Sequence, residues 1–261
     1  MSFFFEDSPS SPSSPKQAKH FVSFGCAFLF LSFFVFLAFT AIDYNWNWSS
    51  VFQYKKKFID GWLISVGISF VTLFFSLIVG FLAAMGKRST LLPIKYVASI
   101  YIELVRGTPL LVQIYLFYYV IADAAGVDNR YVMGVVIMSL FSGAYIAEIF
   151  RAGIESVGKS QLLSAKAIGL SSKQTYRFVI IPQALRNSLP ALAGQFANLI
   201  KDSSLLSTIA IREFTLNAQE VNSITYSSFE SYFPLAIGYL AITLPVMQLS
   251  RVIENKIRFE T

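Results

Sequence analysis

The sequence predicts an all-α polytopic membrane protein with six transmembrane helices, and three observations lead to that prediction. Of the 261 residues, 55% are hydrophobic and only 14% are charged, whereas about 25% are charged in a typical soluble domain. Uncharged runs of 20 or more residues recur along the chain, and each is long enough to cross a hydrocarbon core about 30 Å thick. The single cysteine, Cys26, excludes an intrachain disulfide and a cysteine-based zinc site.

Three of the six predicted spans have 20 or more consecutive uncharged residues; they are 21–42, 61–85 and 231–250. The other three are shorter or interrupted by charge; they are 107–122, 131–147 and 187–200, the last of which resumes at 203–211. A charged side chain near the end of a span can extend so that its charged group reaches the membrane interface. The interrupted spans are therefore still expected to cross the membrane.

The N-terminal residues 1–20 contain a Ser/Pro tract, which predicts a disordered tail before an additional N-terminal span at 21–42. No small-residue cleavage site follows that run, so we expect an uncleaved anchor. With the N-terminus inside, 14 of the 21 Lys and Arg residues lie on the inner side and five outside. This distribution predicts that both termini are cytoplasmic, with residues 251–261 as a short tail. The outer run Lys55, Lys56 and Lys57 is an exception without an assigned role.

The one large polar loop, residues 151–186, has the sequence of an ordered docking element. Residues 161–168 favour a helix, and Gly169 stands where a left-handed residue ends one. Ser171 and Gln174 predict a capping box that opens a second helix, and Pro182 is expected to stop or kink it. Ser164, Ala165 and Ala167 thin the first helix, so that another surface could approach its backbone. A cationic loop that only determined the orientation of the chain in the membrane would not need these signals for helix starts and ends.

The third span is too short to cross the membrane alone. Thr108 and Pro109 predict an N-cap and the first residue of a helix. The 14 residues from there to Ala122 extend about 21 Å, so residues 97–105 must also enter the membrane or lie at its inner face. Glu103 and Arg106 are three residues apart and are expected to pair with each other rather than contact a substrate.

The fifth span carries the polar residues that are hardest to explain inside a membrane. Charges at membrane depth usually face a cavity or pair with each other. One interpretation is a helix interruption that lines a translocation path, and the other is a structural Lys–Asp pair or a helix break between subunits. Both stay open for the following residues: Asn198, Lys201, Asp202, Ser203 and Ser204.

Three motifs carry a resemblance to a known family. Segments 164–171 (SAKAIGLS) and 180–186 (IIPQALR) resemble the EAA loop of ABC-importer permease subunits. Segments 147–154 (AEIFRAGI) and 101–113 (YIELVRGTPLLVQ) resemble runs in the polar amino-acid branch of that family, the histidine, glutamine, arginine and glutamate type. The resemblance extends from about residue 57 to the C-terminus, with the motifs in the family's order. Leu163 stands where the family has its Glu, so a polar contact to the partner is absent.

The resemblance implies a type I ABC-importer core at 58–250, preceded by the extra span, and makes the loop 151–186 its coupling loop. The coupling residues it implies are Gln161, Ser164, Ala165, Ala167, Gly169, Leu170 and Pro182. The third-span motif comprises Glu103, Arg106, Gly107, Thr108, Pro109 and Gln113.

The resemblance also implies partners. Two separate ATPase subunits would dock on the coupling loop, a second copy or a sister permease would complete the membrane domain, and an extracytoplasmic binding protein would deliver a polar amino acid. The chain has no Gly-x-x-x-x-Gly-Lys-Ser/Thr phosphate loop, so it is not expected to be an enzyme itself. No cofactor, metal or nucleic acid is expected. The implied location is the cytoplasmic (inner) membrane of a bacterium.

Two other classes of protein compete with this interpretation. An ATP-independent channel or ion-coupled carrier would show a polar stripe across several spans and would need no ordered loop. An integral-membrane enzyme would need a cluster of catalytic side chains, which one histidine and no other catalytic cluster make untenable. Within the transporter class, cystine or an opine is an alternative cargo. The sequence identifies neither the amino acid nor the choice between homodimer and heterodimer.

Overall fold

The computed structural model describes residues 16–40, 44 and 46–258, which belong to two units, Met1–Trp46 and Asn47–Thr261. The first unit contains one helix, α1 (Lys16–Thr40). This helix begins before the predicted tail boundary at residue 20, because the Lys-Gln-Ala-Lys sequence at its start favours a helix. The Ser/Pro tract lies outside the described residues. The additional membrane span at 21–42 stays a prediction.

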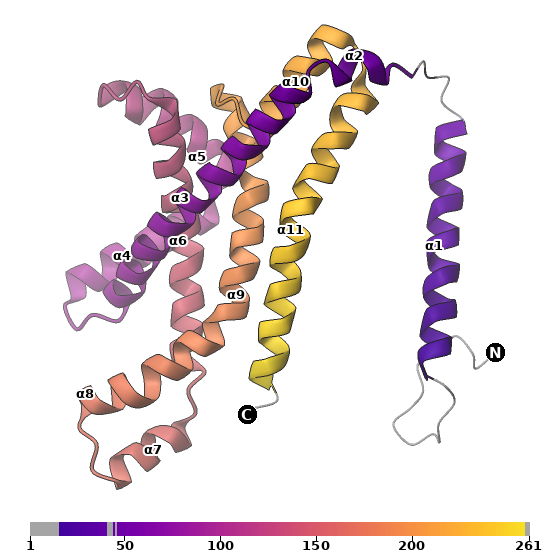
Figure 1. The fold of residues 1–261 in the computed structure, drawn as a ribbon. Helices are drawn as coiled ribbons and strands as arrows, with labels where there is room; N and C mark the ends of the chain where they lie inside the picture. The colour runs from indigo at the N-terminus through magenta and orange to yellow at the C-terminus, as the bar shows by residue number, and fades with distance from the viewer. Residues whose placement is uncertain (1–15, 41–43, 45, 259–261) are drawn as a thin grey trace. The chain divides into compact units, whose positions relative to one another are not determined.

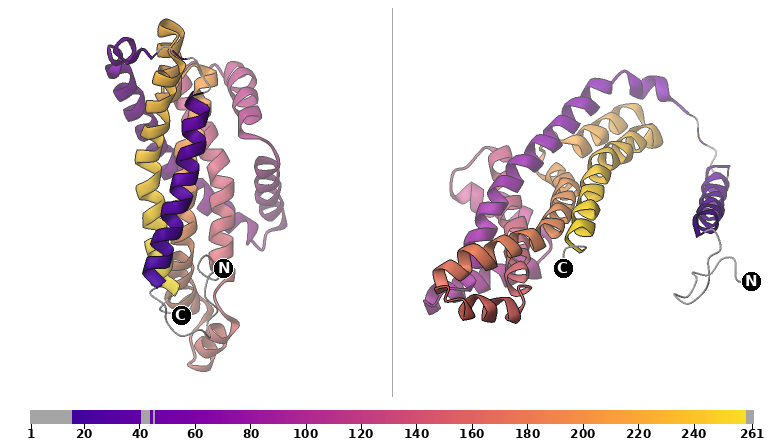
Figure 2. Two further views of the ribbon diagram at one scale, coloured as in Figure 1. Left: turned by 90° about the vertical axis from the view of Figure 1, so that its right-hand side faces the viewer. Right: turned by 60° about the horizontal axis from the view of Figure 1, so that its bottom comes forward.

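Four long helices form the second unit (Figures 1 and 2). They are α3 (Lys55–Lys87), α6 (Arg130–Glu155), α9 (Ile181–Asp202) and α11 (Ser228–Arg258). Helix α3 packs along α6, and α9 packs between α6 and α11. Among the described helices, Lys55–Lys87, Arg130–Glu155 and Ser228–Asn255 are long and apolar enough to cross a membrane. They contain the predicted spans 61–85, 131–147 and 231–250, and α11 extends into the predicted C-terminal tail.

The predicted third span is one arm of a bent pair. Helix α4 (Leu92–Gly107) meets α5 (Leu110–Leu116) and the π-helical η2 (Phe117–Ala122) at a bend of 110°. The predicted N-cap is wrong by one residue: Thr108 ends α4, and Pro109 is the N-cap of α5. The reason is that the Thr108 hydroxyl donates back to the carbonyl of Leu104 at 2.9 Å, within α4.

The fifth span changes helix type at the predicted charge pair. Helix α9 ends at Asp202, the 3₁₀ helix η4 (Ser203–Ile209) follows, and Ala210 is left-handed with φ of 57°. The described helices therefore provide three apolar spans, or four when the bent pair counts as one. The six-span count stays a prediction.

Short helices complete the second unit. Helices α2 (Trp48–Phe52) and α10 (Phe214–Thr225) lie at one end, and α7 (Lys159–Ala167) and α8 (Ser172–Thr175) lie at the other (Figure 1). We refer to these as the α10 end and the α7 end.

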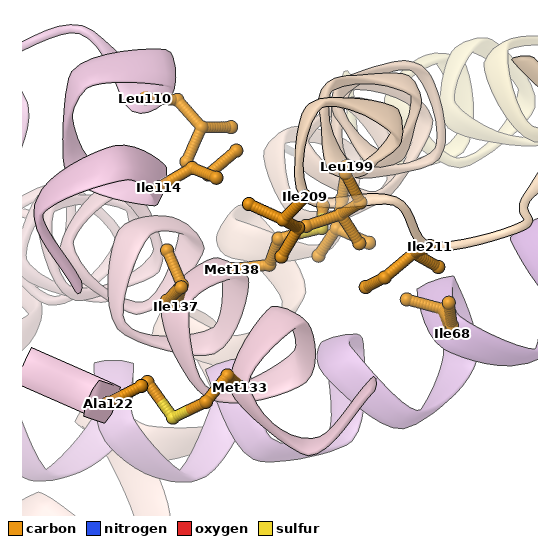
Figure 3. Close-up of a cluster of buried hydrophobic side chains, with 11 residues drawn as sticks. Ile68, Leu110, Ile114, Ala122, Met133, Ile137, Met138, Leu199, Ile209 and Ile211 are labelled. Carbon is orange, nitrogen blue, oxygen red and sulfur yellow. The ribbon is translucent and has the colours of Figure 1, made fainter. Parts of the chain in front are cut away.

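The main hydrophobic cluster packs around the break in the fifth span (Figure 3). It joins α3, α5, η2, α6 and α9 to η4 and the residues that follow it. Its buried members are Ile68, Leu110, Ile114, Ala122, Met133, Ile137, Met138, Leu199, Leu206, Ile209 and Ile211. Because lipid tails are as apolar as these side chains, close packing rather than exclusion of water holds such a cluster together within a bilayer. The cluster fixes the bent pair and the helix break against α6.

Candidate functional site

The coupling loop has the ordered ends that its sequence predicts. Gly169 has φ of +79°, and its N–H donates to the carbonyl of Lys166 at 3.0 Å, while the Leu170 N–H donates to Ala165, also at 3.0 Å. These two bonds form a Schellman motif, which needs a left-handed residue after the helix. The capping box is also present: Ser171 N–H donates to Gln174 Oε1 at 2.8 Å, and Gln174 N–H donates to Ser171 Oγ at 3.3 Å.

Of the two predicted effects of Pro182, a stop or a kink, the structure excludes the stop. The chain stays helical from Ser172 to Asp202, through α8, the π-helical η3 (Tyr176–Ile180) and α9. Proline lacks an N–H and is tolerated in the first turn of a helix. Here Pro182 falls in the first turn of α9, directly after the π-helical turns of η3. The absence of its backbone N–H therefore destabilises the helix only slightly.

Of the three small residues predicted to let another surface approach α7, one is buried. Ala165 is 3% exposed because α7 packs on α8 and η3, so this residue shapes the loop rather than offering a surface to a partner. Gln161, Ser164 and Ala167 are exposed. The exposed surface also includes large apolar side chains, which are Leu163, Ile168 and Phe178.

The loop is joined tightly to the helix bundle. Asn187 Nδ2 donates to Ser156 Oγ at 2.8 Å, and the Ser188 hydroxyl of α9 donates to the carbonyl of Ile149 in α6 at 3.4 Å. A Cβ on Gly153 would collide with Ser188 Oγ and lie 2.7 Å from the Ala184 oxygen, so α6 and α9 can cross this closely only at a glycine. The coupling loop thus joins two helices that are in close contact where they leave it.

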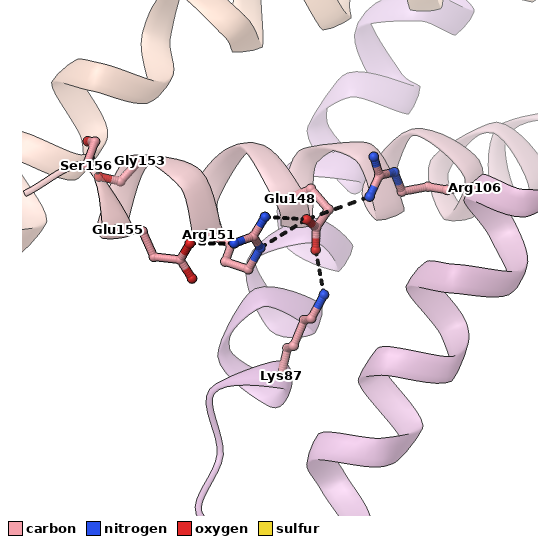
Figure 4. A network of polar contacts seen from close by, with 7 residues as sticks. All are labelled: Lys87, Arg106, Glu148, Arg151, Gly153, Glu155 and Ser156. Atoms are coloured by element: carbon pink, nitrogen blue, oxygen red, sulfur yellow. Dashed lines mark hydrogen bonds and ion pairs between the residues drawn. The ribbon is translucent and has the colours of Figure 1, made fainter.

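A cluster of charges lies on α6 beside this crossing (Figure 4). The Glu148 carboxylate is 2.8 Å from Lys87 Nζ, 2.8 Å from Arg151 Nη2 and 3.6 Å from Arg106 Nη1. Arg151 also pairs with Glu155. The cluster therefore connects the end of α3, the end of α4 and the part of α6 that enters the coupling loop.

Arg106 is close to the bend between α4 and α5. Its guanidinium lies 5.4 Å from the centre of the Tyr145 ring. The predicted pairing of Glu103 with Arg106 is wrong: among the described residues, Arg106 pairs with Glu148, and Glu103 is exposed and makes no ion pair. Because Glu103 and Arg106 lie on the same helix, their spacing alone could not show that a carboxylate from another helix was nearer.

Gln113 holds the bend itself. Its Nε2 donates to the carbonyl of Val105 at 2.7 Å and to Thr108 Oγ1 at 2.8 Å. These contacts join α5 to the last turn of α4 across the break. Gly107 and Pro109 are exposed within the same turn, so they allow the bend without packing against other elements.

A cleft of about 610 Å³ opens between α4, α6 and α9 at the charge cluster. Its polar walls include Arg106, Glu148, Arg151, Asn187 and Gln195. Gln195 is buried and donates from Nε2 to Ser142 Oγ at 3.2 Å. Such a cleft offers both charge signs and amide groups to a small polar molecule.

The polar residues of the fifth span lie at its change of helix type. Asn198 and Lys201 are exposed, and Asp202 is half-buried; in the part of the chain that the structure describes, the side chains of these three residues form no hydrogen bond or ion pair. Ser203 is buried and donates to the carbonyl of Ile200 at 2.7 Å, and Ser204 is half-buried. The exposed groups are therefore available to a ligand or to another subunit.

Comparison with known proteins identifies the family. The model described as "Binding-protein-dependent transport system inner membrane component" matches residues 76–259, which is more than half of the chain. The chain belongs to this family. It is a membrane-spanning permease subunit of an ABC transport system, with the all-helical type I permease fold.

Two curated relatives cover most of this permease. GlnP, the glutamine transport system permease protein of Escherichia coli (strain K12), is 34% identical over 217 residues, which are 82% of this chain and 99% of the relative. GlnM, the probable glutamine ABC transporter permease protein of Bacillus subtilis (strain 168), is 32% identical over 200 residues, or 77% of this chain and 93% of the relative.

Solved structures agree with these relatives. An amino acid ABC transporter crystallised with histidines has a chain 36% identical to this permease, with a TM-score of 0.77; the match covers 82% of this chain and all of that one. The inward-facing MetNI methionine ABC transporter matches at 15% identity and a TM-score of 0.61, over 76% and 96% of the two chains, which shows the fold alone.

The permease contains a second carboxylate cluster that sequence reasoning missed. Glu213 is fully buried; its carboxylate accepts from Ser65 Oγ at 3.2 Å, from Tyr239 OH at 3.0 Å, and from the N–H groups of Thr215 and Leu216 at 2.9 and 2.8 Å. Burial raises the pKa of Glu213 above its ordinary value, and these four hydrogen bonds oppose that rise. The sequence could have indicated only one part of this cluster, namely that Glu213 is the N-cap residue of helix α10.

Proposed function

We propose that this permease carries a polar amino acid across the bacterial inner membrane, with energy from a separate ATPase. The observation that carries the proposal is the 36% identity, over 82% of the chain, to the permease of an amino acid ABC transporter. Glutamine is the first amino acid to test, because the curated relatives are named as glutamine permeases.

The proposed complex contains two ATPase subunits, a second copy of this chain or a sister permease, and an extracytoplasmic binding protein. The ATPases would dock on the coupling loop, since its helices are fixed at both ends and expose the apolar side chains of Leu163, Ile168 and Phe178. Gln161, Ser164 and Ala167 would border that contact, while Ala165, Gly169 and Leu170 would hold its shape. This arrangement would make the α7 end cytoplasmic, and the distribution of Lys and Arg supports cytoplasmic termini.

The proposed coupling route runs from the loop to the bent pair. Movement of α7 and α8 would pass to α6 and α9 where they cross at Gly153, and along α6 to Glu148. The pair between Glu148 and Arg106 would then shift the end of α4, and Gln113 would carry that shift into α5. ATP binding would thereby change the angle of the bend beside the polar cleft.

The proposed substrate pathway passes the exposed polar groups of the fifth span. An amino acid carries an ammonium and a carboxylate, and Asp202 and Lys201 offer the opposite charges to each. Asn198 and the carbonyl groups freed where α9 becomes 3₁₀ would add hydrogen bonds, with Ser203 and Ser204 fixing that turn. The predicted N-terminal span at 21–42 would be an uncleaved membrane anchor.

Uptake in cells that lack their own glutamine importer tests the transport proposal. The permease is expressed with its ATPase and binding protein, and uptake of radiolabelled glutamine and a panel of other amino acids is measured. ATP-dependent uptake of at least one polar amino acid is expected. Uptake that persists without the ATPase would favour a channel or ion-coupled carrier instead.

Co-purification of the ATPase tests the docking surface. Ile168→Asp with Phe178→Asp places charge on two exposed side chains of the coupling loop, and loss of the ATPase from the purified complex is expected. Ile224→Asp, on an exposed side chain of α10 at the other end of the unit, is the matched control. Equal ATPase recovery from the loop variant and the control would exclude this surface.

A further inference from the structure

An apolar groove runs along the outside of the α3–α4 pair. It has a volume of about 520 Å³, and its walls include Val79, Leu82 and Gly86 from α3 and Pro93, Val97 and Tyr101 from α4. The Tyr101 hydroxyl already donates to the backbone carbonyl of Leu140, which also lines the groove. The groove therefore presents hydrocarbon almost throughout.

The length of the groove matches one leaflet of a bilayer. Its walls extend over eight residues of α3, from Val79 to Gly86, and nine of α4, from Pro93 to Tyr101. At 1.5 Å per residue these stretches rise about 10–12 Å, against about 15 Å for half of the hydrocarbon core. An acyl chain lying along the groove would reach the interface where α3 ends and α4 begins.

Basic side chains stand at that end of the groove. Arg88 follows the last turn of α3, and Lys95 is in the first turn of α4; both are exposed. Lys87, beside them, is already paired with Glu148 at 2.8 Å. Arg88 donates to the neutral Tyr176 hydroxyl at 2.7 Å, and no carboxylate among the described residues pairs with Arg88 or Lys95. Two positive charges at the interface are thus left uncompensated.

We propose that this groove binds an anionic glycerophospholipid of the surrounding bilayer, with an acyl chain along α3 and α4 and its phosphate beside Arg88 and Lys95. Basic pockets between membrane helices attract anionic headgroups, and each nearby cation adds to that attraction. The apolar wall selects a lipid over a free phosphate. The bound lipid would lie next to Lys87 and Tyr176, between the charge cluster and the coupling loop.

Native mass spectrometry of the full-length permease, purified in mild detergent with phosphatidylglycerol or phosphatidylcholine, tests the proposal. Retention of phosphatidylglycerol above phosphatidylcholine is expected. Arg88→Gln with Lys95→Gln should reduce that preference about 25-fold, since each cation near the surface accounts for roughly a fivefold preference. Lys55→Gln with Lys56→Gln removes the same charge from the other end of α3 and should leave the preference unchanged.

A second variant tests the groove rather than the charges. Val97 is 69% exposed, so Val97→Trp fills the groove without burying the new side chain, and retention of both lipids should fall. Soluble glycerol phosphate should not displace the bound lipid. The proposal is overturned if wild type shows no preference, if the charge variant keeps it, or if glycerol phosphate competes. It is also overturned if Val97→Trp abolishes self-association while lipid retention stays unchanged, because a second copy would then occupy the groove.

Discussion

Two carboxylates organise the two ends of the helix bundle, and their surroundings are opposite. Glu148, toward the α7 end, is surrounded by three cations, its side chain is 16% exposed, and its partners lie on three helices. Glu213, toward the α10 end, is fully buried and accepts from two hydroxyls and two backbone N–H groups. Glu148 is thus surrounded by charged side chains, whereas Glu213 is surrounded by neutral hydrogen-bond donors.

The difference indicates which end of the permease can change its contacts. Long Lys and Arg side chains can exchange a carboxylate partner at little cost where water reaches them. A buried carboxylate that loses a donor leaves an unsatisfied polar group, which is expensive. We therefore expect the Glu213 cluster to hold α3, α10 and α11 together in every state, and the Glu148 cluster to rearrange during transport.

The largest expected effect on stability is at Glu213. Glu213→Ala leaves four buried donors without their acceptor, so the permease should lose about 3 kcal/mol of stability or more. Thermal unfolding of the purified protein, followed by fluorescence-detected size exclusion, measures this loss. Glu213→Gln keeps one acceptor oxygen and should fall between wild type and Glu213→Ala. A Glu213→Ala variant as stable as wild type would show that the cluster does not hold the helices.

The largest expected effect on coupling is at Glu148. Glu148→Gln leaves Lys87, Arg106 and Arg151 without a shared carboxylate, so substrate-stimulated ATPase activity should fall roughly tenfold, a typical size for coupling between sites. Glu155→Gln is the matched control, because Glu155 lies on the same helix, is 53% exposed and, among the described residues, forms an ion pair only with Arg151. If both variants reduce stimulation equally, the route through Arg106 is wrong.

Two substitutions with smaller expected effects separate stability from coupling to the ATPase. Tyr239→Phe removes one donor from Glu213 and should cost about 1 kcal/mol of stability with coupling unchanged. Arg106→Gln removes a half-exposed partner 3.6 Å from Glu148, so stability should change by only a few tenths of a kcal/mol, while stimulated ATPase activity falls. Unfolding and ATPase assays on both variants check this. A reversal of the two effects would invert the assignment of fixed and mobile ends.

The features that the sequence predicted well are those set by residues close together in the chain. Gly169 and the Ser171–Gln174 pair determine the coupling loop through bonds that span at most five residues. The helix breaks near Thr108 and Asp202 likewise follow from local proline and charge. The sequence could not decide between a stop and a continued helix at Pro182, because a proline that stops one helix and a proline in the first turn of the next look alike locally.

Both carboxylate clusters depend on contacts between distant segments. Ser65 and Glu213 are 148 residues apart, and Lys87 and Glu148 are 61 apart. No periodicity identifies which helices bring such residues together. Glu103 shows the consequence: its spacing from Arg106 predicted a pair, and tertiary packing supplied a nearer carboxylate from α6.

The smallest expected effect tests whether charge alone makes a site mobile. Lys57, whose run had no assigned role, pairs with Glu220 on α10 at 2.6 Å, with side chains 38% and 28% exposed. Lys57→Gln should cost only a few tenths of a kcal/mol, because exposed pairs are weak and Arg212 still lies 3.4 Å from Glu220. High salt should remove even that difference in stability, because salt screens exposed charges. Thermal unfolding at low and high salt measures the difference, and Lys56→Gln is the control. If Lys57→Gln instead impaired stimulated ATPase activity as strongly as Glu148→Gln, ion pairs at the α10 end would also rearrange during transport, and the contrast between a fixed and a mobile end would fail.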